Sequence, residues 1–120
     1  MTGTVTLSIE IELGWSTPRT VSSQGPPLST ERATEREYLS RLLEKADEAG
    51  IEISVDIVGH LLEDSCSRDH SGPYTDGWFS VDPGTDRGTD PEFYAPDLID
   101  QIKAADIEHE IGTHTYSHIH

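Results

Sequence analysis

The chain has 120 residues, with 23 Asp and Glu against 8 Lys and Arg, and a formal net charge of −15. This length predicts at most one small domain with a modest core. The charge argues against binding to nucleic acid, which requires Lys and Arg to neutralise phosphates, and it disfavours anionic membrane surfaces. No apolar run is long enough for a transmembrane helix.

The acidic residues recur along the chain from Glu10 to Glu110, and lysine is limited to Lys45 and Lys103. Two interpretations are open: a solvated surface that keeps the protein soluble, or the adaptation of a halophile to high salt. Cys66 is the single cysteine, which excludes an internal disulfide. Because no secretory signal is visible either, we expect a cytoplasmic protein.

The first predicted element is a strand over residues 4–12, in which apolar and polar residues alternate. Its polar face ends with Glu10 and Glu12. A loop rich in Ser, Thr, Gly and Pro is predicted over residues 15–28. Ser29 and Thr30 are then N-cap candidates for a helix with an apolar stripe, and Gly50 suits the position after its end.

A second alternating strand is predicted over residues 51–57, closed by Gly59 and His60. Residues 65–92 follow as a long irregular segment with four glycines and three prolines. Connections of this length are usually disordered or functional, and Trp78 and Phe79 argue against simple disorder. A helix over residues 96–105 and a strand over residues 107–113 complete the order.

The alternation of strands and helices predicts an α/β fold with a parallel sheet or barrel. In such folds, sites lie at the carboxyl ends of the strands. We therefore expect Glu10 and Glu12, Gly59 and His60, and the residues after 113 to converge on one rim.

His114 and His118 are four residues apart, so their imidazoles face the same way if the segment forms one helical turn. Two histidines and one carboxylate, with an open position for water, make a catalytic zinc site. Glu10 and Glu12 point to one face of a strand, so one can bind the metal while the other acts as a base. Against this, such histidine pairs occur by chance on surface helices, and acidic residues on strands are often only solvated.

The segment Glu110-Ile111-Gly112-Thr113-His114-Thr115-Tyr116-Ser117-His118 resembles the second motif of the polysaccharide deacetylase family, also called the NodB-homology or carbohydrate esterase 4 family. In that motif, Gly and a small residue precede His-Ser/Thr-x-x-His. The segment Leu7-Ser8-Ile9-Glu10-Ile11-Glu12 resembles the first motif, and Ser54-Val55-Asp56-Ile57-Val58-Gly59 is similar to the family's second strand.

The resemblance implies that Glu10 is the catalytic base and that Glu12, His114 and His118 bind a divalent metal, zinc in our expectation. It implies a hydrolase of carbon–nitrogen bonds other than peptide bonds, which removes N-acetyl or O-acetyl groups from a carbohydrate. The fold it implies is the N-terminal part of a deformed (β/α) barrel, truncated after the third strand. Residues 1–120 would then be a single, incomplete catalytic domain.

The chain departs from the family pattern in two ways. Glu stands in the first motif where Asp is usual, which moves the carboxylate by about 1 Å, a shift that is costly in a positioned site. The chain also ends before the family's later motifs, including the histidine that serves as general acid. Two alternatives therefore stay open: a catalytically incompetent remnant, and a half-domain that needs a complementing C-terminal partner. An unpaired sheet edge beside His114 is expected in either case.

Other residues have two interpretations each. Asp56 either lines the site or is a hydrogen-bonded interior carboxylate, and Glu110 is a candidate to support the metal ligands from behind. Trp15, Trp78 and Phe79 form either a sugar-stacking wall or, as we prefer, loop packing. We expect Cys66 to be a small, partly buried residue, and the histidines outside the pair to be structural or surface residues: His60, His70, His109 and His120.

Overall fold

The computed structural model describes residues 3–16 and 33–118. It is a mixed α/β structure with a parallel sheet of three strands, in the order β1-β2-β3. The strands are β1 (Ser8–Ile11), β2 (Ser54–Ile57) and β3 (Glu110–Thr113). The helices are α1 (Ala33–Ala49) and α2 (Asp97–Lys103), with short 3-10 turns η1 (Leu13–Trp15) and η2 (Gly59–Leu62). The predicted α/β class and parallel sheet are confirmed.

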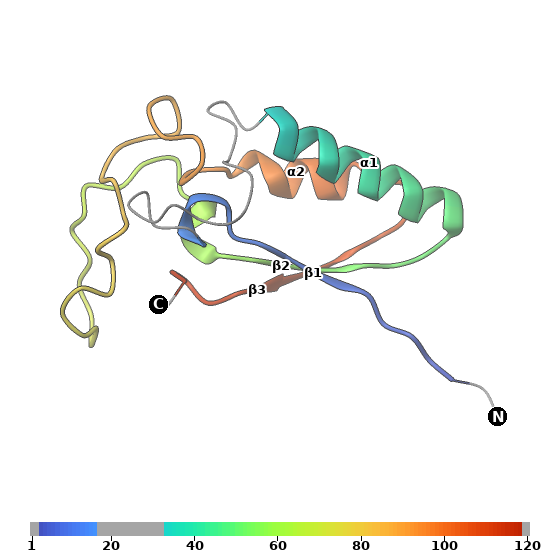
Figure 1. Ribbon diagram of the computed structural model, residues 1–120, viewed down its shortest axis with the longest axis horizontal. Helices are drawn as coiled ribbons and strands as arrows, with labels where there is room; N and C mark the ends of the chain where they lie inside the picture. Colours follow the sequence, from blue (N-terminus) through green and yellow to red (C-terminus); the bar gives the residue numbers. More distant parts are fainter. Residues whose placement is uncertain (1–2, 17–32, 119–120) are drawn as a thin grey trace.

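Figure 1 shows both helices on the same side of the sheet. The sheet face that they cover is apolar, because alternate residues of the strands point toward them: Val55 and Ile57 are buried, and Ile9, Ile11 and Ile111 are partly buried. The opposite face carries polar residues in register, with Glu10 beside Asp56 and Asp56 beside Gly112. The core therefore lies between the sheet and the helices.

Helix α1 forms because its apolar residues recur at helical spacing, which buries Leu39, Leu43 and Ala46 on one stripe. It ends at Ala49, and Gly50 adopts a φ of +63°, the left-handed conformation that glycine accommodates without steric cost. This confirms the predicted stop. The predicted N-cap residues Ser29 and Thr30, and most of the predicted 15–28 loop, lie outside the described residues.

The strands are shorter than the alternation in the sequence predicts. Val5 is 94% exposed and Leu7 46% exposed, although both belong to the apolar face of the predicted strand. Ile51, at the start of the predicted second strand, is also exposed. An alternating pattern gives the face on which a residue lies, but not how far the neighbouring strand and helix extend to cover it.

The long segment between η2 and α2 has little regular structure, as predicted, but it is anchored. Its one isolated β-bridge joins Ser65 to Asp86. At its far end, Phe93, Tyr94 and Ala95 are buried. The amide of Ala95 donates a hydrogen bond to the carbonyl of Leu61, which closes the segment back onto η2. Neither described helix combines the length and the apolar character needed to cross a bilayer.

Candidate metal centre

The carboxyl ends of β1 and β3 bring three of the predicted site residues together. The Nε2 atom of His114 lies 2.9 Å from Oε1 of Glu12, and the Nε2 atom of His118 lies 3.0 Å from the same oxygen. We call Glu12, His114 and His118 the rim cluster. Their side chains are between 20% and 28% exposed, so solvent reaches the cluster from one side. The predicted ligand set is thus assembled in space.

The two histidines are paired by a local geometry other than a helical turn. Residues 114–118 form a bend and not a helical turn, and Thr115 has a φ of 59°. The bend is tied down by two backbone hydrogen bonds, from the amide of Gly59 to the carbonyl of Thr115 (2.8 Å) and from the amide of His60 to the carbonyl of Tyr116 (2.7 Å). The two imidazoles therefore approach the same carboxylate oxygen without the helical turn considered from the sequence.

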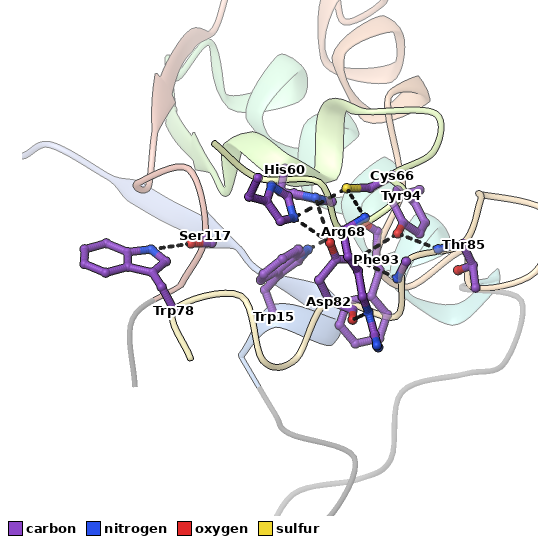
Figure 2. A network of polar contacts seen from close by, with 12 residues as sticks. Trp15, His60, Cys66, Arg68, Trp78, Asp82, Thr85, Phe93, Tyr94 and Ser117 are labelled. Carbon is purple, nitrogen blue, oxygen red and sulfur yellow. Dashed lines mark hydrogen bonds and ion pairs between the residues drawn. The ribbon is translucent and has the colours of Figure 1, made fainter. Parts of the chain in front are cut away.

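A third tie comes from the long loop. The indole Nε1 of Trp78 donates a 2.7 Å hydrogen bond to Oγ of Ser117, which is 1% exposed (Figure 2). A cavity of about 210 Å³ opens beside His118 and is lined by Trp78 and by residues 75–77 and 80–81. The loop therefore both holds the bend and leaves space next to the cluster.

Glu10 lies at the edge of this arrangement. Its carboxylate is 60% exposed, and its Oε1 atom is 3.8 Å from Nδ1 of His114, beyond hydrogen-bonding distance. Asp56 stands next to it in the sheet, and a Cβ atom at Gly112 would collide with the Asp56 carboxylate. Glu110, the predicted support for the ligands, is exposed.

The three donor atoms of the rim cluster suit a zinc ion. Two imidazole nitrogens and one carboxylate oxygen are a known catalytic donor set, with bonds of about 2.0–2.2 Å, which puts neighbouring donors about 3.3 Å apart. The observed separations of 2.9 and 3.0 Å need only a small widening. Both Nε2 atoms face the same oxygen, an arrangement that either a bound cation or two imidazole N–H donors would satisfy.

The structure also contains a second group of metal-type donors that the sequence did not predict. One donor atom from each of His60, Cys66, His70 and Asp82 lies within 4.8 Å of the others. Figure 2 labels three of them, His60, Cys66 and Asp82. We call these four residues the loop cluster. The sequence assigned the histidines structural or surface roles, and the one available signal was the Cys-x-x-x-His spacing of Cys66 and His70. The ring of His70 stacks on Phe79, and Trp15 is buried against His60, so these aromatic residues serve loop packing as preferred.

Burial decides the direction of the pKa shift at two residues of the loop cluster. It lowers the pKa of His60, which favours the neutral imidazole, and it raises the pKa of the Cys66 thiol. Burial acts to raise the pKa of Asp82 as well, but hydrogen bonds from His70, the Gly84 amide and Tyr94 outweigh it and hold the pKa below its ordinary value. Burial raises the pKa of Tyr94 to about 12, so its hydroxyl remains a donor.

One further described histidine lies outside both clusters. His109 is 8% exposed, and its Nδ1 atom accepts a hydrogen bond from the amide of Ile53, which makes it structural as expected. His120 lies outside the described residues.

No family model, curated protein or solved structure matches this chain. The resemblance to polysaccharide deacetylases is therefore carried by the motifs alone.

Proposed function

We propose that this chain carries the metal site of a metal-dependent hydrolase of the polysaccharide deacetylase type. Glu12, His114 and His118 would hold zinc, and Glu10 would be the base. The observation that carries the proposal is the approach of two imidazole Nε2 atoms to one carboxylate oxygen, at 2.9 and 3.0 Å, on a partly exposed rim. The proposed substrate is an N-acetylated, or O-acetylated, carbohydrate.

The bound metal would polarise the acyl carbonyl and lower the pKa of water. The residues of the chain would position the ligands and accept the proton. Glu12 places a carboxylate between the histidines, and the bend at residues 114–118 fixes both rings on its two sides. Glu10, whose carboxylate is exposed to solvent beside His114, would accept a proton from water as it attacks the carbonyl carbon.

The fold supports the same proposal at the level of topology. In a (β/α) barrel, consecutive parallel strands are neighbours and every helix packs on the outer face. Here the order is β1-β2-β3, with both described helices on one face, as Figure 1 shows. The uncovered polar face, with Glu10 and Asp56, would line the barrel interior. We propose that the described residues are the N-terminal part of such a barrel.

The cavity beside His118 supports a sugar-sized substrate. It adjoins the rim cluster, and the indole of Trp78 lines it. An aromatic ring at a site wall suits the apolar face of a pyranose, while the acidic surroundings disfavour an anionic substrate. A neutral acetylated sugar fits both conditions.

A specific observation favours a second candidate, a metal-binding half-domain without turnover. The Glu10 carboxylate is 60% exposed and makes no hydrogen bond to the rim cluster, so it is not held in position for proton transfer among the described residues. A complementing partner that covers the polar sheet face would supply that positioning.

Two matched substitutions separate these candidates. In the full chain, Glu12→Gln should remove one equivalent of tight zinc binding measured by calorimetry. Glu10→Gln should leave the affinity nearly unchanged, and should lower acetate release from N-acetylglucosamine oligomers by about 10²–10⁴-fold if Glu10 is the general base. Zinc binding without acetate release would favour the half-domain, and equal zinc binding by Glu12→Gln and the parent would refute the rim site.

A further inference from the structure

We propose that His60, Cys66, His70 and Asp82 form a second metal site, a closed four-ligand zinc centre that holds the long loop against the sheet. It is separate from the rim cluster in its residues, its burial and its role. The proposal stands on an unpartnered buried histidine, on donor spacing, and on hydrogen bonds that leave the donor atoms facing one another.

The buried histidine is His60 of η2. Its side chain is fully buried, and neither ring nitrogen has a hydrogen-bond partner among residues 3–16 and 33–118. Its Nε2 atom points toward Oδ2 of Asp82 at 3.5 Å, outside good hydrogen-bond distance. An imidazole with two unsatisfied nitrogens in the interior is costly, and native proteins seldom leave such a group without a partner. A metal bound to Nε2 removes part of that cost.

The spacing of the other donors fits a tetrahedral ion. Neighbouring donors around zinc lie about 3.3–3.5 Å apart when nitrogen and sulfur bonds have their usual lengths. Sγ of Cys66 is 3.4 Å from Nε2 of His70, and Nε2 of His60 is 3.5 Å from Oδ2 of Asp82. The pair between His70 and Asp82 is closer, at 2.7 Å, and would widen by about 0.6 Å.

The hydrogen bonds around the cluster orient Asp82 for this role. Its Oδ1 atom accepts from the Gly84 amide (2.8 Å) and from the Tyr94 hydroxyl (3.0 Å), as Figure 2 shows for Tyr94. The other oxygen, Oδ2, is left toward His60 and His70. Hydrogen bonds of this kind fix metal-ligating carboxylates in proteins.

Cys66 is supported in the same way. The amide of Arg68 donates to its sulfur at 3.3 Å, a contact that favours a thiolate. The Nε atom of Arg68 donates to the backbone carbonyl of Asp82 at 2.7 Å, so one residue contacts both Cys66 and Asp82. Zinc binding would release the thiol proton and leave two neutral imidazoles, one thiolate and one carboxylate, which balance the +2 ion.

The donor set decides the class of metal and of site. Two nitrogens, one sulfur and one oxygen suit zinc and exclude calcium and magnesium, which take oxygen ligands. Four protein donors, two of them buried and two partly buried, leave no position for substrate, which is typical of structural zinc. The site would join η2 to two distant points of the loop, in addition to the Ser65–Asp86 bridge and the hydrogen bonds of Trp78 and Ala95.

The test uses the full chain with His114→Ala and His118→Ala, which blocks the rim cluster. Cobalt is the probe, because a thiolate ligand gives a sulfur-to-cobalt charge-transfer band. We expect one equivalent of Co²⁺ with that band, displaced by one equivalent of Zn²⁺. Cys66→Ser should abolish the band, and Tyr94→Phe should weaken binding by about 10- to 100-fold. Asp76→Asn, which changes an exposed carboxylate of the same loop, should change nothing.

A second measurement covers the case in which Cys66→Ser fails to fold. Because Cys66 is the single cysteine, alkylation of the chain reports on this site alone. Saturating zinc should slow alkylation of the rim-blocked chain at least tenfold. The absence of bound cobalt, binding without a charge-transfer band, or alkylation at the same rate with and without zinc would each overturn the proposal.

Discussion

The rim cluster and the loop cluster contain similar donors in opposite surroundings. The rim cluster has three donors on strand ends and side chains that are 20–28% exposed. The loop cluster has four donors, and the side chains of His60 and Asp82 are fully buried. An open three-donor site leaves room for substrate, whereas a closed four-donor site serves stability. The histidine and acid content alone therefore does not distinguish the two clusters, whereas burial and the number of donors do.

The largest expected effect is a difference in the free energy of unfolding, in the metal-free protein, between a variant of the loop cluster and a variant of the rim cluster. Asp82→Ala removes a buried carboxylate that serves His70, Gly84 and Tyr94, and should lower the free energy of unfolding by about 3 kcal/mol. Glu12→Ala changes a partly exposed ion pair and should cost no more than about 1 kcal/mol. Urea unfolding monitored by circular dichroism measures both. Equal losses in the two variants would remove the distinction between a buried and an open cluster.

A smaller effect is expected at the strand that leads into the rim. Gly112→Ala places a methyl group against the Asp56 carboxylate, which must move, at a cost of about 1–2 kcal/mol. Adding Asp56→Ala should recover most of that loss in a double-mutant cycle. Zinc affinity at the rim should fall in Gly112→Ala, while cobalt binding by the loop cluster should not. A loss of affinity at both sites would contradict the prediction that this strand position affects the rim cluster alone.

The smallest expected effect concerns Asp47, which belongs to neither cluster and serves as a control. Asp47 accepts hydrogen bonds from the amides of Asp106 and Ile107, which hold its pKa below its ordinary value. A depressed carboxyl pKa contributes stability above the unfolded pKa of about 3.9, and that stability is lost as the pH falls through the folded pKa. Wild type should therefore exceed Asp47→Ala in thermal midpoint at pH 6, with the gap closing toward pH 3. Zinc affinity at both clusters should be unchanged.

The sequence predicted that Glu12 and His114 would meet because regular elements determine their positions, whereas the choice of Glu12 over Glu10 as ligand came from the resemblance to the deacetylase motif. The alternation around Glu12 and the strand before His114 place both residues at carboxyl ends of parallel strands, and parallel strands end at one edge. The same alternation could not show that Val5 and Leu7 would stay exposed. That outcome depends on how far neighbouring elements extend, which is a tertiary property.

The sequence could not predict the loop cluster, because no periodicity relates its members. His60 follows β2, whereas Asp82 comes 22 positions later in an irregular segment whose path depends on local contacts. Those contacts include the left-handed conformations of Arg68 and Gly84, with φ of 63° and 66°. The sequence left open whether residues 114–118 form a helical turn for the same reason, since the conformation there depends on hydrogen bonds to η2.

The backbone hydrogen bonds from Gly59 and His60 to Thr115 and Tyr116 join the two clusters mechanically, because His60 belongs to one and the bend carries both histidines of the other. Ordering η2 by a ligand on its imidazole would also order the bend. Thermodynamic linkage then requires reciprocity: whatever factor occupancy of the interior site adds to affinity at the rim, occupancy of the rim returns to the interior. The chain would thus take up its two ions as coupled events, with the protected one preparing the exposed one.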